Sequence, residues 1–153
     1  MQLHLPHHFQ KKRYTCGPAS IRAIAEFFGK SISERSLESC VLVTKTHGTS
    51  RKNMTVLLAS VGLQSREVRF GTLSDIMDAL KRGHPVIVNY QVPKYEEDHY
   101  AVVKGVTPQS VYLSDPSRGK HFHLSRSQFL SRWRNTRLKK KYTGWMIEVC
   151  RVE

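Results

Sequence analysis

Long apolar runs are missing from this sequence of 153 residues. A membrane-spanning helix needs roughly 18 or more apolar residues in a row, and no segment reaches that length. The opening MQLHLPHHFQKKR also lacks the apolar core of a signal peptide. We therefore expect a soluble, cytoplasmic protein with no membrane span. Internal repeats and Pro/Gly/Ser-rich linkers are absent as well, which predicts a single domain over residues 1–153.

Cysteine is scarce, with only Cys16, Cys40 and Cys150. An odd number without a CxxC pair argues against a disulfide framework and a cysteine-based zinc site. We expect three thiols, with Cys40 and Cys150 acting as small buried apolar residues. The histidines in HLPHH (4–8) and HFH (121–123) have neither HExxH spacing nor cysteine partners, so we expect no metal ion.

Acidic residues are few, with 12 against 25 lysines and arginines, a formal net charge of +13. Such a chain attracts polyanions, but the charge alone fits nucleic acid, membrane headgroups and acidic peptides equally well. The stretch RWRNTRLKKK (132–141) concentrates this charge. It is either a solvated connection or a docking surface for an acidic peptide or nucleic acid, with Trp133 as a stacking residue.

The apolar residues change period halfway along the chain. Helical spacing predicts helices from Pro18 to Gly29, within 33–42, from Thr49 or Ser50 to Gly62, and from about Ser74 to Gly83. β-Branched and aromatic runs predict strands at 86–91, 100–105, 110–114 and 145–152, with 67–70 a further candidate and 125–133 a short helix. Helices first and an antiparallel sheet after them indicate an α+β fold.

The segment QKKRYTCGPAS (10–20) places Cys16 at the start of the first predicted helix. A thiol attacks only as its thiolate, which the unpaired N–H groups and the dipole of a helix N-terminus favour. Gly17 permits close approach of the backbone, and Pro18 suits a first helical turn. The Cys16 N–H and the side-chain amide of Gln10, six residues earlier, could both donate to an oxyanion.

A nucleophilic thiol needs a base and a group that orients the base. His99 begins one predicted strand and Asp115 ends the next, at positions symmetric about residue 107. If the two strands pair, both side chains lie at the same end of the hairpin. Asp115 could then hold one ring nitrogen of His99 while the other faces Cys16. The sequence therefore predicts a Cys/His/Asp triad.

Several motifs resemble those of the papain-like cysteine peptidase domain of bacteriocin-processing transporters. They are Gln10 with CGPAS, GTS…NMTVLLASVGL, GHPVIVNY, HYAVVKG and YLSDPSRG, in order over nearly the whole chain. The resemblance implies a papain-like fold, with N-terminal helices packed on a C-terminal antiparallel sheet, and removal of double-glycine leader peptides. It also implies Cys16 as nucleophile, His99 as base, Asp115 as orienting group and Gln10 as oxyanion donor, with no cofactor. Its partner would be a peptide or protein substrate.

Other functions remain open at this point. The same triad can transfer an acyl group to an amine, which would make the protein a transpeptidase or an amide-forming acyl transferase. A non-catalytic peptide-binding module typically loses the nucleophile, which this chain retains. A basic nucleic-acid-binding module would show affinity that falls steeply with salt, but no nucleic-acid-binding motif is present. We interpret the chain as a cysteine peptidase.

Overall fold

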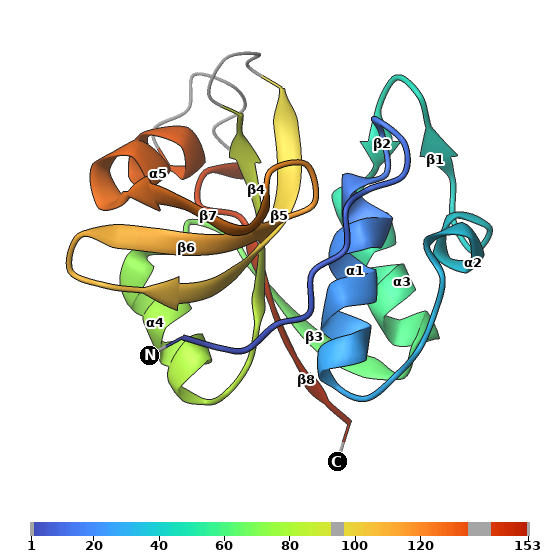
Figure 1. Ribbon diagram of the computed structural model, residues 1–153, viewed down its shortest axis with the longest axis horizontal. Helices are drawn as coiled ribbons and strands as arrows, with labels where there is room; N and C mark the ends of the chain where they lie inside the picture. Colours follow the sequence, from blue (N-terminus) through green and yellow to red (C-terminus); the bar gives the residue numbers. More distant parts are fainter. Residues whose placement is uncertain (1, 93–96, 135–141, 153) are drawn as a thin grey trace.

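The computed structural model describes residues 2–92, 97–134 and 142–152 (Figure 1). In chain order its elements are α1 (Cys16–Phe27), α2 (Glu34–Glu38), β1 (Val43–Thr44), β2 (Gly48–Thr49), α3 (Arg51–Ser60), β3 (Leu63–Val68), α4 (Leu73–Lys81), β4 (Val86–Gln91), β5 (Asp98–Val106), β6 (Ser110–Asp115), β7 (Gly119–Ser125), α5 (Arg126–Trp133) and β8 (Met146–Arg151).

Every helix except α1 begins where the sequence offers a capping side chain. Ser50, Thr72 and Ser125 each accept a hydrogen bond from the backbone N–H three residues later, at the starts of α3, α4 and α5. Such a bond satisfies one of the N–H groups that a helix leaves unpaired at its first turn. All five predicted helices are present in the structure, with ends shifted by a few residues.

Six strands form one antiparallel sheet in the order β3-β8-β4-β5-β6-β7, and β1 and β2 form a separate hairpin. The α+β class is confirmed. Two details of the expected strands were wrong. The candidate strand at 67–70 is β3 and covers Leu63–Val68, and residues 119–125 form an unpredicted strand, β7.

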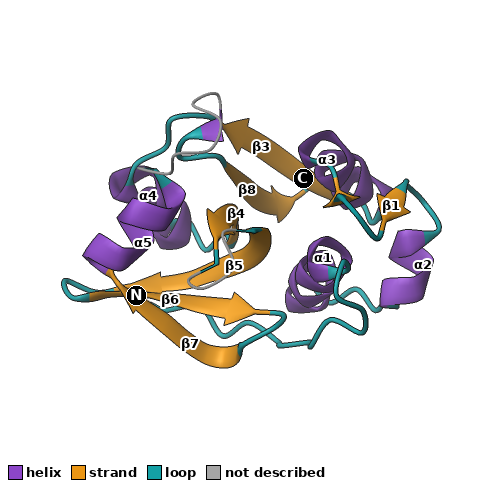
Figure 2. Cartoon of the chain, turned by 90° about the horizontal axis from the view of Figure 1, so that it is seen from above, coloured by secondary structure: helices purple, strands orange, loops and turns teal. Residues whose placement is uncertain are grey.

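Helices cover both faces of this sheet. α1, α2 and α3 lie on one side, and α4 and α5 on the other (Figures 1 and 2). Strand β4 shows the consequence, because Ile87 packs in the cluster with α1 and α3, whereas Val86, Val88 and Tyr90 pack in the cluster with α4 and α5. A strand buried on both faces reads as a nearly continuous apolar run, as VIVNY does apart from Asn89.

A β-bulge in β5 decides which side chains share a face. Val106 pairs with Val111, but Val103 pairs with Leu113, so Lys104 is an extra residue on β5. Because side chains alternate between faces, one extra residue reverses the face of everything beyond it. Without the bulge, His99 and Asp115 would point to opposite sides of the sheet. The hairpin is not centred on residue 107 as predicted, because its turn spans Thr107–Ser110. The bulge nevertheless leaves His99 and Asp115 on the same face of the sheet.

Candidate active site

Cys16 is the first residue of α1, at a helix N-terminus that no side chain caps. The Thr15 hydroxyl occupies the capping position, but it accepts from the Lys12 N–H at 3.1 Å and donates to the Lys12 carbonyl at 2.9 Å. Gly17 lets the helix approach its neighbours, because a Cβ there would lie 2.9 Å from Met54 Sδ and 3.1 Å from Thr49 Oγ1. The first turn therefore keeps N–H donors beside the thiol.

His99 and Asp115 meet as a buried pair at the end of the β5–β6 hairpin. His99 Nε2 lies 2.8 Å from Asp115 Oδ1, and the two side chains are 9% and 0% exposed. The Ser117 N–H at 2.8 Å and the Arg118 N–H at 3.2 Å donate to the same oxygen. These bonds fix the carboxylate and, through it, the orientation of the imidazole.

Tyr90 completes the pair and was not predicted. Its hydroxyl donates to Asp115 Oδ2 at 2.5 Å, and its residue pairs with His99 across β4 and β5. Burial, and then the charge of Asp115, raise the pKa of Tyr90, so it remains a donor. Burial alone would raise the pKa of Asp115, but the hydrogen bonds from His99 and Tyr90 outweigh it and hold that pKa at about 2.

His99 faces Cys16 as well as Asp115. Burial alone would lower the pKa of His99, but its side-chain hydrogen bonds to Asp115 and Cys16 outweigh burial and raise that pKa to about 10. These contacts favour the protonated imidazole. Because Nε2 contacts Asp115, Nδ1 is the ring nitrogen left for the thiol. A positive charge next to a thiol favours the thiolate, the reactive form.

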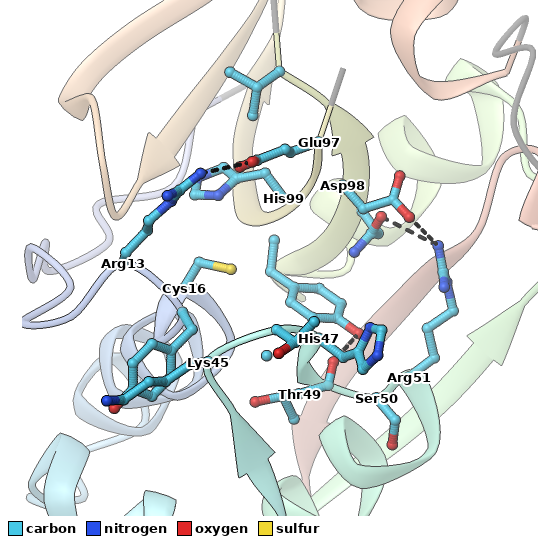
Figure 3. A pocket seen from close by; sticks show the side chains of 16 residues that line it. Arg13, Cys16, Lys45, His47, Thr49, Ser50, Arg51, Glu97, Asp98 and His99 are labelled. Atoms are coloured by element: carbon cyan, nitrogen blue, oxygen red, sulfur yellow. Dashed lines mark hydrogen bonds and ion pairs between the residues drawn. The ribbon is translucent and has the colours of Figure 1, made fainter. Parts of the chain in front are cut away.

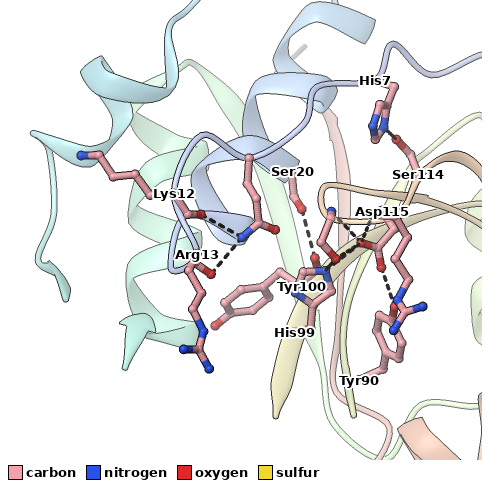
Figure 4. A network of polar contacts seen from close by, with 12 residues as sticks. His7, Lys12, Arg13, Ser20, Tyr90, His99, Tyr100, Ser114 and Asp115 are labelled. Atoms are coloured by element: carbon pink, nitrogen blue, oxygen red, sulfur yellow. Dashed lines mark hydrogen bonds and ion pairs between the residues drawn. The ribbon is translucent and has the colours of Figure 1, made fainter. Parts of the chain in front are cut away.

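Gln10 lies near this site, but its side-chain amide is engaged elsewhere. Nε2 donates to the carbonyls of Lys12 and Arg13, each at 2.9 Å (Figure 4). The Gln10 backbone N–H donates to the Pro116 carbonyl at 3.0 Å, which ties the segment before α1 to the turn after Asp115. An oxyanion-binding role for Gln10 remains a prediction, and it requires one amide proton to leave these carbonyls.

A cleft of about 520 Å³ opens at Cys16 and His99. Figure 3 shows the sulfur of Cys16 pointing into it. An ion pair between Arg13 and Glu97, 2.8 Å long, lies on one side. On another side Arg51 hydrogen-bonds Asn89 at 3.2 Å and stacks on the Tyr142 ring, 3.7 Å from its centroid. The cleft is therefore lined by charged side chains of both signs and is large enough for a segment of peptide.

The remaining residues singled out in the sequence have other surroundings. Cys40 is exposed and Cys150 half-buried, so the prediction that both are buried was wrong. Cys40 lies in a polar surface turn after α2, and Cys150 near the end of strand β8. Of the basic stretch 132–141, residues 135–141 lie outside the described part of the chain. Trp133 is buried and its indole N–H donates to the Trp145 carbonyl at 2.9 Å, so its predicted stacking role was wrong.

The described residues hold no group of three or more histidine, cysteine or acidic side chains that could bind a metal ion. His7 instead contacts Ser114, and His8 pairs with Glu26. Within the same ranges, no helix has the length and apolar character needed to cross a membrane.

An α+β domain with a thiol at a helix N-terminus, opposite a histidine held by an aspartate, has the arrangement of papain-like cysteine peptidases. Comparison with known proteins gives the family. Residues 4–143 match the model of the peptidase C39 family, and the chain belongs to it.

The chain is 30% identical over 111 residues to an uncharacterized protein of Methanothermobacter thermautotrophicus, covering 72% of this chain and 71% of that protein. Two solved structures share the fold. One is the peptidase domain of Streptococcus ComA, a bi-functional ABC transporter, with a TM-score of 0.75, 22% identity, and coverage of 97% and 98% of the two chains. The other is a double glycine motif protease from an AMS/PCAT transporter in complex with the leader peptide, with a TM-score of 0.73, 17% identity, and coverage of 99% and 94%.

Proposed function

We propose that this protein is a cysteine peptidase that cleaves a peptide bond with Cys16, His99 and Asp115. The observation that supports it most is His99, which is hydrogen-bonded to the Asp115 carboxylate and lines the same cleft as the Cys16 thiol. An imidazole held in this way can take up and return a proton without changing its position.

The reaction begins with attack of the Cys16 thiolate on the carbonyl carbon of the scissile bond. The resulting oxyanion accepts hydrogen bonds from the Cys16 N–H and from the Gln10 amide, once that amide has left its resting partners. The imidazolium of His99 gives its proton to the leaving amine as the C–N bond breaks. His99 then takes a proton from water, which attacks the thioester and releases the new carboxylate and the thiol sulfur.

We further propose that the substrate carries two glycines before the scissile bond. Membership of the peptidase C39 family supports this, as does the double glycine motif named for one of the similar structures. Cleavage of a peptide with Gly-Gly and of matched peptides with bulkier pairs tests the preference. Equal cleavage of the bulky pairs would refute it.

Alkylation with iodoacetamide over a range of pH, with each cysteine followed by mass spectrometry, tests the catalytic assignment. We expect Cys16 to react several-fold faster than Cys40 at about pH 6, well below the ordinary thiol pKa of about 8.5, because His99 places a positive charge beside it. Cys40 is an internal control because it is exposed and accessible to the reagent.

The His99→Ala variant should remove the advantage of Cys16 and leave the rate at Cys40 unchanged. If Cys16 and Cys40 show the same pH profile in the unaltered protein, the thiol is not activated and the proposed mechanism is wrong.

A further inference from the structure

A second hollow, the His7 pocket, lies beside the proposed catalytic centre. It has a volume of about 810 Å³ and is lined by His7, Phe9, Arg118, Lys120, His121 and Phe122. The segment 7–16 separates it from the catalytic cleft, because His7 and Phe9 line the pocket while Arg13, Tyr14 and Cys16 line the cleft. The two sites therefore share one stretch of backbone.

The ionisable side chains that line the His7 pocket are all basic. Arg118 extends over the Phe122 ring, 5.1 Å from its centroid, and within the described ranges neither Arg118 nor Lys120 forms an ion pair with a carboxylate. The nearby carboxylate of Asp115 is fully buried and already accepts bonds from His99, Tyr90 and its own turn. The charge in this pocket is therefore not neutralised by the protein.

Lys104, the extra residue of the β5 bulge, adds a buried positive charge behind the pocket. It is 8% exposed, and its Nζ donates to the backbone carbonyl of Lys120, a pocket residue. Burial, and then the charge of Lys120, lower the pKa of Lys104. A buried lysine is normally paired with a carboxylate, whereas among the described residues Lys104 has only a backbone carbonyl as its partner, so its charge adds to that of the pocket.

His7 provides a second unsatisfied group. Its Nδ1 lies 3.0 Å from Ser114 Oγ, whereas its Nε2 is buried and has no hydrogen-bond partner among the described residues. The ring packs edge-on against Phe9, which is 63% exposed. The His7 ring therefore contributes a polar edge next to an exposed aromatic ring at the wall of the pocket.

We propose that the His7 pocket binds an acidic segment of the peptide substrate, with a carboxylate near Lys120 and Arg118 and an apolar side chain against Phe9. This inference rests on the proposed peptidase function. Position favours a peptide over nucleic acid, because the wall of the pocket belongs to the same turn that holds Asp115, where the Arg118 N–H donates to Oδ1 at 3.2 Å. The cations also surround a cavity next to apolar rings and do not form the long track that a nucleic-acid backbone requires.

Binding can be measured separately from cleavage in the Cys16→Ala protein, which lacks the nucleophile. The probe is a fluorescein-labelled peptide in which glutamates alternate with leucines before a C-terminal Gly-Gly, compared by fluorescence anisotropy with the same peptide carrying glutamine for each glutamate. We expect the acidic peptide to bind at least about fivefold more tightly, as expected for more than one charge pair in a partly buried site.

The Arg118→Gln/Lys120→Gln double variant should abolish that preference. Lys30→Gln, a matched change at an exposed lysine beyond α1, should retain it. Equal affinity for the two peptides would refute the proposal, as would an equal loss with Lys30→Gln, which would indicate general charge attraction. Displacement of the acidic peptide by an equimolar single-stranded oligonucleotide would assign the pocket to nucleic acid.

The two proposals fail in different ways. If the catalytic assignment is wrong, the unaltered protein does not cleave Gly-Gly peptides, yet the preference for the acidic peptide in Cys16→Ala persists. If only the pocket assignment is wrong, cleavage occurs with the same KM for acidic and glutamine-containing peptides.

Discussion

Replacing Tyr90 by phenylalanine removes one hydroxyl from the candidate site and should cost more than its size suggests. The Tyr90 hydroxyl is the only donor to Asp115 Oδ2 among the described residues, whereas Oδ1 retains His99 and the Ser117–Arg118 turn. Because Asp115 is fully buried, water does not replace the lost donor. A hydrogen bond to a charged group contributes about 1.5–3 kcal/mol, and we expect a loss of that size in the free energy of unfolding at neutral pH.

The loss should depend on pH in a defined direction. The pKa of Asp115 is held at about 2, so ionised Asp115 stabilises the fold above its ordinary pKa of about 3.9, and that stability disappears as the pH falls toward 2. Without Tyr90 the folded-state pKa rises toward the ordinary value. The difference between the unaltered protein and Tyr90→Phe should therefore be largest at neutral pH and should shrink below about pH 3.

Urea denaturation at several pH values measures this difference. Tyr112→Phe is the matched control, because Tyr112 is half-buried on β6 and its hydroxyl forms no hydrogen bond in the described part of the chain. Equal stability of the two variants at neutral pH, or a loss in Tyr90→Phe that does not change with pH, would refute the role assigned to the Tyr90 hydroxyl.

Two further predictions concern residues away from the cleft. Gly144→Ala should lower the free energy of unfolding by more than about 2 kcal/mol, because φ is +64° and a Cβ would lie 2.5 Å from the Gly71 carbonyl oxygen. Gly83→Ala should lower it by only about 1 kcal/mol, because φ is +79° but no atom lies within 4 Å of the added Cβ. Thermal melts of both variants measure the difference, and equal losses would contradict the packing argument. Glu148→Gln should leave Arg66, Arg82 and His84 without the carboxylate they share, so these basic side chains repel one another and the variant is less stable. Added NaCl screens this repulsion, so the stability of the variant should rise with salt, and the absence of such a rise would contradict the argument.

The sequence predicted those parts of the site that depend on local pattern. α1 has regular apolar spacing, and Cys16 precedes Gly17 and Pro18 at its start, so both the helix and its first residue could be located. His99 and Asp115 lie near the outer ends of two apolar strands joined by a short turn, so the sequence places them at the same end of a hairpin.

The rest depends on contacts that are distant in sequence. The bulge at Lys104 leaves no periodic signal, although it decides the face on which His99 lies. β7 is an edge strand in which only Leu124 is buried, and its alternation of apolar and polar residues is limited to Phe122 and Leu124, a short signal that the sequence interpretation did not use. The bond from Tyr90 to Asp115 joins residues 25 apart on strands that are not neighbours, and the Gln10 amide is directed by local carbonyls that no motif reveals.

The residues of the proposed triad are unequally spaced in the sequence, and this spacing affects the order in which they meet during folding. His99 and Asp115 are 16 residues apart on one hairpin, whereas Cys16 joins them only when α1 packs on β5. Hairpins close within microseconds, and contacts between distant segments form more slowly. The alkylation rate of Cys16 during refolding would therefore report when α1 reaches the sheet, which makes the thiol a built-in probe of one long-range step in assembly.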